Sequence, residues 1–360
     1  MNINNSLSIV LTLKDRHDFT IRWLDWAKKN HCKYNILIAD GSKDDFVRSL
    51  LKKGEYNNLS IEYHRYSPDK KIYDWFNKLY KIVSRVKTKY VIHADNDDFI
   101  LFDNLRNVIK KFNNLQDVNA YSRPQLRIKF DYVGKDLKKH LYPKKNIYLR
   151  KINYRKEFKI LMEENSINRL EYVIRNFEAS LIWYAVHKTE NLKRIHKKIL
   201  ENNFKIVMMQ EWYLYYSSIA SGKCIIENDD PYLIRQAMTS DSAASLFSLE
   251  RFDKIFLNNS WSRDLGLLIK DLYLDVNANL YGYDFKKFDI WFKSHFHYHL
   301  SSWNKFQYFA DRFRDNKYYD FFKKIIKYLI SFHNKNGSYK NYKAFNKINE
   351  INSLYRFLKN

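Results

Sequence analysis

Short apolar runs alternate with stretches of helical periodicity over about the first 115 residues. Continuous apolar runs are typical of strands covered on both faces, whereas apolar residues three or four positions apart are typical of helices that bury one face. The runs lie at 8–13, 36–39 and 90–94, with a weaker alternating segment at 59–63, and the helical patterns begin at the capping residue types Asp18, Ser67-Pro68 and Asp103. This alternation predicts an α/β fold with a doubly wound, mostly parallel sheet flanked by helices.

The pattern changes after this region. We expect a strand at 126–130, a basic, Tyr-rich inserted loop at 131–154 that can cover a substrate, and a strand at 181–186. Thr189 caps a helix, a second helix opens at Met208 and can end at Gly222, and 224–226 forms a strand or buried loop. From Ser245 onwards the sequence is helical, basic and aromatic-rich. We therefore predict a first domain over 1–240 and a helical C-terminal region over 241–360.

Three carboxylates follow the apolar run at 90–94, in Asp95-Asn96-Asp97-Asp98. Ligands of open α/β sheets bind at the carboxyl ends of the strands, so we expect a site here. Clustered acids repel one another by about 1 kcal/mol or more per close pair at intermediate dielectric, unless a cation or hydrogen-bond donors offset the repulsion. A metal-bound phosphate ester would meet that need. The alternative interpretation is a solvated turn with an Asp helix cap.

The composition is that of a globular protein. Hydrophobic residues make up 45% of the chain and aromatic residues 17%, which excludes global disorder. Only 7 Gly and 4 Pro occur, which favours long helices over a turn-dense β sandwich. Two cysteines, Cys32 and Cys224, are too few for a disulfide framework and fit a reducing compartment. Because residues 1–6 lack the features of a signal peptide and no run of ~18 apolar residues occurs, we expect a cytoplasmic protein.

The formal net charge of +24 predicts attraction to an anionic partner. From residue 305 onwards, 13 Lys or Arg stand against 4 Asp or Glu, and lysines flank an apolar stripe at 318–332. This surface could lie on the anionic inner face of the cytoplasmic membrane, as in a peripheral membrane protein, or the stripe could pack on the first domain. A basic nucleic-acid-binding protein is an alternative. Because the basic residues are spread along the chain and no reader motif occurs, we expect no nucleic acid partner.

Two common nucleotide-binding motifs are missing from the sequence, the Gly-x-Gly-x-x-Gly fingerprint and the Gly-x-x-x-x-Gly-Lys phosphate loop. Their absence argues against dehydrogenases and P-loop NTPases. A nucleotidyltransferase is a further alternative, since it also combines an α/β fold with metal-binding acids. Such an enzyme usually has a glycine-rich basic loop after its first strand, and Lys14-Asp15-Arg16-His17 contains no glycine.

Three strand ends resemble those of the family 2 glycosyltransferases, which have the nucleotide-sugar-binding GT-A fold. The first strand ends in Thr12-Leu13-Lys14-Asp15-Arg16, where the family has an Asn-Arg pair and Asp15 replaces Asn. The second ends in Asp40-Gly41-Ser42, as in the family. The strand that closes the nucleotide-binding half ends in Asp95-Asn96-Asp97-Asp98, which matches the family's Asp-x-Asp-Asp. The resemblance covers roughly residues 6–238.

The resemblance implies a nucleotide-sugar donor, with a preference for a UDP-sugar. It also implies a divalent cation, Mg²⁺ or Mn²⁺, held on the donor's diphosphate by Asp97 together with Asp95. Asp40 would accept a hydrogen bond from the nucleotide base, and Asp95 would face the ribose. The remaining nucleotide-binding candidates are Thr12, Arg16 and Arg235, and the two guanidinium groups suit phosphate geometry.

The implied acceptor is a hydroxyl group of a glycan or lipid-linked glycan, in the synthesis of surface polysaccharide or lipopolysaccharide. Inverting transfer needs a general base to take the proton of that hydroxyl. The family carries the base in a Glu-Asp pair at a helix start, and the matching position here is Gln210-Glu211, which implies Glu211 as the base. The longer side chain must reach the same point, and the preceding acid is lost. The alternative is that Glu211 is merely an acid favoured by the helix dipole.

Overall fold

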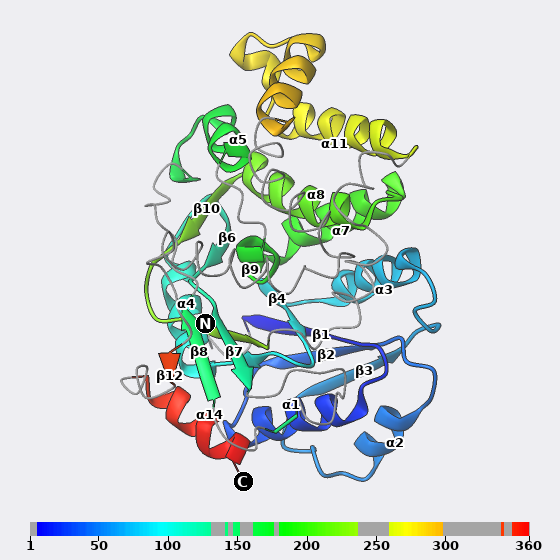
Figure 1. Cartoon of the computed structure of the whole chain (residues 1–360), viewed down its shortest axis with the longest axis vertical. Helices are drawn as coiled ribbons and strands as arrows, with labels where there is room; N and C mark the ends of the chain where they lie inside the picture. The colour runs from blue at the N-terminus through cyan, green and yellow to red at the C-terminus, as the bar shows by residue number, and fades with distance from the viewer. Residues whose placement is uncertain are drawn as a thin grey trace, which may run out of the picture.

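The computed structural model describes residues 6–130, 141–142, 147–151, 161–175, 180–236, 259–297, 340–341 and 348–359. Its centre is a seven-stranded sheet in the order β10-β6-β9-β4-β1-β2-β3 (Figure 1). The strands are β1 (Leu7–Leu13), β2 (Asn35–Asp40), β3 (Ile61–Arg65), β4 (Tyr90–Asp95), β6 (Val118–Ser122), β9 (Val186–Lys188) and β10 (Lys223–Ile226). β3, β2, β1 and β4 are parallel neighbours, β9 runs antiparallel to β4 and β6, and β10 is parallel to β6. The predicted mostly parallel α/β sheet is confirmed.

A second sheet has the order β12-β8-β7-β11-β5. Its strands are β5 (Phe99–Ile100), β7 (Leu126–Phe130), β8 (Ile147–Lys151), β11 (Leu233–Gln236) and β12 (Lys340–Asn341). β5 follows β4 closely and pairs antiparallel with β11, so the three acids lie where the two sheets meet. The prediction of a loop over 131–154 is wrong at Ile147–Lys151. These residues form the strand β8, because they pair antiparallel with β7. Apart from β8 and residues 141–142, that predicted loop lies outside the described residues.

Helices cover both faces of the seven-stranded sheet. They are α1 (His17–Lys29), α2 (Phe46–Lys52), α3 (Ile72–Arg85), α4 (Phe102–Asn113), α5 (Ser166–Arg175), α6 (Ser180–Trp183), α7 (Thr189–Asn202), α8 (Val207–Ala220), α11 (Trp261–Asp275), the 3₁₀ helix η4 (Ala278–Tyr281) and α14 (Asn349–Lys359), and residues 285–297 are also helical. In Figure 1, α1 and α2 lie below β1, β2 and β3, and α3, α7 and α8 lie above these three strands. The predicted apolar faces are the buried ones, as Trp23 and Trp26 of α1 show with exposures of 1% and 0%.

The predicted caps are not the N-cap residues of these helices. Thr189 is the first residue of α7, after the N-cap Lys188. Asp18 and Asp103 lie inside the first turns of α1 and α4, where the two acids complement the helix dipole without capping it. α3 begins at Ile72, after Ser67-Pro68. The chain before α3 stays beside the end of β2, because Tyr66 N donates to Asp40 O and Asp69 N donates to Gly41 O.

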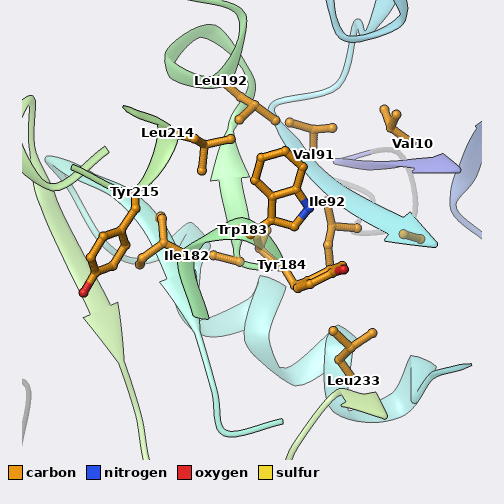
Figure 2. Close-up of a cluster of buried hydrophobic side chains, with 14 of the residues drawn as sticks. Val10, Val91, Ile92, Ile182, Trp183, Tyr184, Leu192, Leu214, Tyr215 and Leu233 are labelled. Atoms are coloured by element: carbon orange, nitrogen blue, oxygen red, sulfur yellow. The ribbon is translucent and has the colours of Figure 1, made fainter. Parts of the chain in front are cut away.

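The strand predicted at 181–186 is a helix in its first half. Ser180–Trp183 form α6, and β9 begins only at Val186. A short apolar run suits a buried helix as well as a buried strand, so its surroundings decide. Figure 2 shows Ile182, Trp183 and Tyr184 packed among side chains of β1, β4, α7, α8 and β11. This packing holds residues 182–184 against the acid-bearing strand.

The C-terminal helix α14 lies against α1 and α4. The ring of Phe357 lies 5.4 Å from that of Trp26, and the Glu350 carboxylate accepts a hydrogen bond from Asn104 N at 3.2 Å. The division into 1–240 and 241–360 stays a prediction, and the stripe at 318–332 lies outside the described residues. Every helix among the described residues is too short or too polar to cross a bilayer.

Candidate functional site

The three acids lie at the carboxyl end of β4. Asp95 is the last residue of β4, and Asp97 and Asp98 follow in the turn before β5. One carboxylate oxygen from each lies within 4.8 Å of the others. Burial, followed by the charge of Asp97, raises the pKa of Asp95 and raises the pKa of Asp98 well above its ordinary value. The alternative of a solvated turn is wrong, because Asp97 and Asp98 are only 5% and 3% exposed.

Asp95 accepts hydrogen bonds on both carboxylate oxygens. Thr12 Oγ1 donates to Asp95 Oδ1 at 3.4 Å, and the hydroxyl of Tyr184 donates to Asp95 Oδ2 at 2.6 Å. Thr12 stands opposite Asp95 in the parallel register of β1 and β4. Burial raises the pKa of the Tyr184 phenol well above its ordinary value, so this group remains a donor at neutral pH. The two contacts hold the Asp95 carboxylate in one orientation.

Arg16 forms an ion pair with Asp97. Its Nη1 and Nη2 atoms both lie 3.2 Å from Asp97 Oδ2. Asp15 and Arg16 have φ angles of 54° and 60°, a left-handed conformation that is uncommon for residues other than Gly and is found at functional loops. The loop after β2 supports it, since Asp15 N donates to Ser42 Oγ at 2.8 Å and Lys43 N donates to Asp15 Oδ1 at 2.9 Å. Two neighbouring loops thus direct Arg16 towards the acids.

Arg235 lies against Asp98 and Tyr184. Its Nε atom is 3.6 Å from Asp98 Oδ2, and its guanidinium carbon is 4.3 Å from the centre of the Tyr184 ring. Asp98 Oδ1 accepts a hydrogen bond from Gln236 N at 3.0 Å. Both contacts come from β11, so the second sheet brings a cation to the acids of the first sheet. The Asp98 carboxylate therefore faces groups of the protein on both oxygens.

Asp40 ends β2 on the same edge of the sheet, but its side chain is fully buried. Asp40 Oδ1 accepts a hydrogen bond from Ser42 N at 2.8 Å and lies 3.3 Å from the Arg65 guanidinium. Asp40 Oδ2 accepts a hydrogen bond from the Tyr63 hydroxyl at 2.8 Å. These contacts shape the loop after β2. The role of Asp40 toward a nucleotide base stays a prediction.

Glu211 lies in the second turn of α8 and is half-buried. The residue before it, Gln210, is buried and donates from Nε2 to Phe204 O at 3.3 Å. Leu214 and Tyr215 from the next turn of α8 lie close to Ile182 in Figure 2, so α8 packs on the segment that carries Tyr184. The role of Glu211 as general base stays a prediction.

Two residues of the site were not identified from the sequence, Tyr184 and Arg22. Arg22 is fully buried between the rings of Phe19 and Phe99, with its guanidinium carbon 4.7 Å from each ring centre. It donates to Asp97 O at 3.3 Å and to Leu141 O at 2.6 Å. Burial lowers its pKa to about 10, so it remains charged at neutral pH. One sign in the sequence indicated that Arg22 belongs to the site. It is a charged residue among the apolar positions of the helix predicted over 19–27.

The side chains present fit a divalent cation. Hard cations such as Mg²⁺ and Mn²⁺ take carboxylate oxygens as ligands, and here the oxygens converge from three acids. Burial is the main cause of the raised pKa of Asp95 and Asp98, and the Asp97 charge adds to it; a bound cation would relieve that repulsion. Two arginines stand beside the same acids. Guanidinium groups next to a cation site form a binding place for a phosphate or diphosphate group.

No family model matches the sequence, and neither does any curated protein. Among solved structures, S. aureus TarS is similar over 76% of this chain and 43% of its own, at 10% identity and a TM-score of 0.39. S. aureus TarS 1–349 in complex with UDP-GlcNAc is similar over 76% of this chain and 73% of its own, at 10% identity and a TM-score of 0.40. The mannosyltransferase PcManGT from Pyrobaculum calidifontis, in complex with GDP-Man and Mn²⁺, is similar over 90% of this chain and 85% of its own, at 12% identity and a TM-score of 0.40. This chain thus spans less than half of the full TarS chain.

Proposed function

We propose that this protein is a glycosyltransferase that transfers a sugar from a nucleotide-sugar donor, a UDP-sugar, to a hydroxyl group of a glycan acceptor. The observation that supports it is the buried acid cluster at the carboxyl end of β4, with Arg16 and Arg235 against Asp97 and Asp98. Ligands of open α/β sheets bind at this edge. Acids that hold a cation, together with arginines that contact phosphate, fit a donor whose leaving group is a nucleoside diphosphate.

On the donor side, Asp97 and Asp95 would hold Mg²⁺ or Mn²⁺. When bound, the cation would stabilise the negative charge that develops on the departing diphosphate. Arg16 and Arg235 would contact the same diphosphate, and Thr12 and Asp40 would lie along the nucleoside. Tyr184 and Thr12 would keep the Asp95 carboxylate oriented through their hydrogen bonds.

On the acceptor side, Glu211 would take the proton of the attacking hydroxyl as general base, which makes the transfer an inverting one. The packing of its helix on the segment of Tyr184, seen at Leu214 and Ile182 in Figure 2, supports this assignment. The acceptor would be a surface polysaccharide or lipopolysaccharide precursor on the cytoplasmic membrane. The net charge of +24 would favour peripheral association with that anionic surface.

This function can be tested by calorimetric titration of the protein with UDP and other nucleoside diphosphates, with and without Mn²⁺. We expect Mn²⁺-dependent binding that discriminates among bases and is lost in Asp97→Ala. Asp284→Ala is the control. Asp284 is an exposed acid that is not part of the acid cluster, so its loss should leave nucleotide binding unchanged. If the wild-type protein binds none of these nucleotides, the acid cluster is a structural turn and the proposal fails.

A further inference from the structure

Both terminal nitrogens of Arg16 converge on a single oxygen, Asp97 Oδ2. In the proposed function, Asp97 is a ligand of the divalent cation. A guanidinium group 3.2 Å from that oxygen disfavours the approach of a second cation, because like charges repel and the guanidinium nitrogens already occupy the oxygen as hydrogen-bond donors. The arrangement therefore shows a protein cation in contact with the predicted metal ligand.

We infer that Arg16 is a displaceable cation, which neutralises Asp97 until a divalent cation arrives and then passes to the diphosphate of the donor. This inference rests on the proposed function and adds an ordered exchange to it. The cation and Arg16 compete for Asp97 when nucleotide is absent. They act together when a diphosphate is present, because the diphosphate gives the guanidinium group an alternative partner.

The comparison with Arg22 supports this exchange. Arg22 is fully buried and donates to the carbonyl oxygens of Leu141 and Asp97 and to the side chain of Gln236, so its guanidinium is held on several sides. The Arg16 side chain is 11% exposed, and among the described residues its guanidinium nitrogens donate to Asp97 alone. Arg16 thus has few bonds to lose beyond those with Asp97.

The surroundings of Arg16 favour movement of its side chain over movement of its backbone. Its guanidinium carbon lies 4.3 Å from the centre of the Phe19 ring, a face along which a planar cation can shift. Its carbonyl oxygen accepts hydrogen bonds from Phe19 N and Thr20 N at the start of α1, which anchors the main chain. The side chain can therefore exchange partners while the loop remains in place.

The inference can be tested by titrating nucleotide-free protein with Mn²⁺. The electron paramagnetic resonance signal of free Mn²⁺ monitors the binding. We expect Arg16→Gln to bind Mn²⁺ about 10-fold more tightly than the wild type, because the competing charge is gone. Arg106→Gln removes an exposed arginine that pairs with Asp103, and it should bind Mn²⁺ like the wild type. Repeating the titrations with UDP should raise the Mn²⁺ affinity of the wild type more than that of Arg16→Gln, because only the wild type gains the contact of Arg16 to the diphosphate.

Equal or weaker Mn²⁺ binding by Arg16→Gln, in protein whose circular dichroism shows it to be folded, overturns the inference. If UDP and Mn²⁺ still bind together to the wild type in that case, the proposed function stands without the exchange. If neither protein binds Mn²⁺ with or without UDP, both the exchange and the metal-assisted function are wrong.

Discussion

The hydroxyl of Tyr184 donates a hydrogen bond to Asp95 Oδ2 at 2.6 Å, across 89 residues of sequence. Tyr184 also lies under the guanidinium group of Arg235, and its carbonyl oxygen accepts a hydrogen bond from the Tyr232 hydroxyl at 2.8 Å. One tyrosine therefore contacts both an acid of the first sheet and a cation of the second. Its loss should disturb the site without removing any charge from it.

Tyr184→Phe should weaken the binding of UDP with Mn²⁺ by about 10-fold, and it should lower the free energy of unfolding by roughly 1–3 kcal/mol, because a partly buried carboxylate oxygen loses its donor. Calorimetry and urea denaturation measure the two effects. Tyr56→Phe is the matched control, since the Tyr56 hydroxyl also donates to an aspartate, Asp25, at 2.9 Å. An equal loss of nucleotide affinity in the control would contradict a specific role for Tyr184.

Asp97 and Asp98 should respond differently to the loss of charge. The Asp98 oxygens face Gln236 N and Arg235, and burial followed by the Asp97 charge raises the pKa of Asp98 well above its ordinary value. Asp98→Asn keeps an acceptor for Gln236 N, so it should change Mn²⁺ affinity by less than about 3-fold, whereas Asp97→Asn should lower it by more than about 10-fold. The same Mn²⁺ titration measures both, and a reversed order would show that Asp98 is the principal ligand.

Gly41→Ala should destabilise the loop after β2. A Cβ atom at position 41 would lie 2.5 Å from Asp69 Oδ1. The Asp69 carboxylate cannot easily move, because it pairs with the buried Lys78, which also donates to Leu13 O at 2.8 Å. We expect a loss of about 1–3 kcal/mol in the free energy of unfolding, measured by urea denaturation.

Gly266→Ala is the control for this substitution. Gly266 lies in α11, and a Cβ atom there would meet nothing within 4 Å. Alanine at this helical position should leave the stability unchanged or raise it by about 0.5–1 kcal/mol. Equal destabilisation by both substitutions would argue against close packing at Gly41.

Three buried histidines should make the protein sensitive to acid. His93 Nε2 and His196 Nε2 are 3.2 Å apart, and His187 Nε2 is 2.7 Å from Ile182 O. Burial lowers the pKa of His187 to about 4, lowers that of His196 to about 3, and lowers that of His93 well below its ordinary value. The unfolded chain would titrate these groups near 6.5. Unfolding therefore takes up protons in this window, and stability falls as the pH drops from about 6.5 towards 4.

The expected slope is about 1.4 kcal/mol per pH unit for each histidine within that window. Urea denaturation at several pH values between 7.5 and 4.5 measures it. His196→Gln should reduce the slope. His31→Asn changes an exposed histidine and should leave the contribution of the three buried histidines to the slope unchanged. An unchanged slope in His196→Gln would show that His196 takes up no additional proton on unfolding.

The sequence was most informative about the central strands. The runs at 8–13, 36–39 and 90–94 correspond to β1, β2 and β4, because a strand covered on both faces must be apolar along its whole length. The parallel order of these strands places their carboxyl ends on one edge. The proximity of Thr12 to Asp95 follows from that order.

The sequence was less informative about segments whose partners are distant. Residues 147–151 were predicted as part of a basic loop although Ile147 and Tyr148 suit a strand, and their pairing with β7 makes them β8. Residues 181–183 have an apolar pattern that suits either a strand or a helix, and packing in the cluster of Figure 2 selects α6. Ser67-Pro68 precede α3 because hydrogen bonds to Asp40 and Gly41 hold that segment beside β2.

By itself, the sequence determined the α/β class, the strands of the parallel half of the sheet and the acids that follow β4, since these depend on the local spacing of apolar and charged residues. Only the tertiary structure decided which groups neutralise those acids. Arg16, Arg235 and Tyr184 reach Asp97, Asp98 and Asp95 from loops and strands far away in the chain. The energy of a buried charge depends on all groups around it, and the three-dimensional packing determines which groups those are.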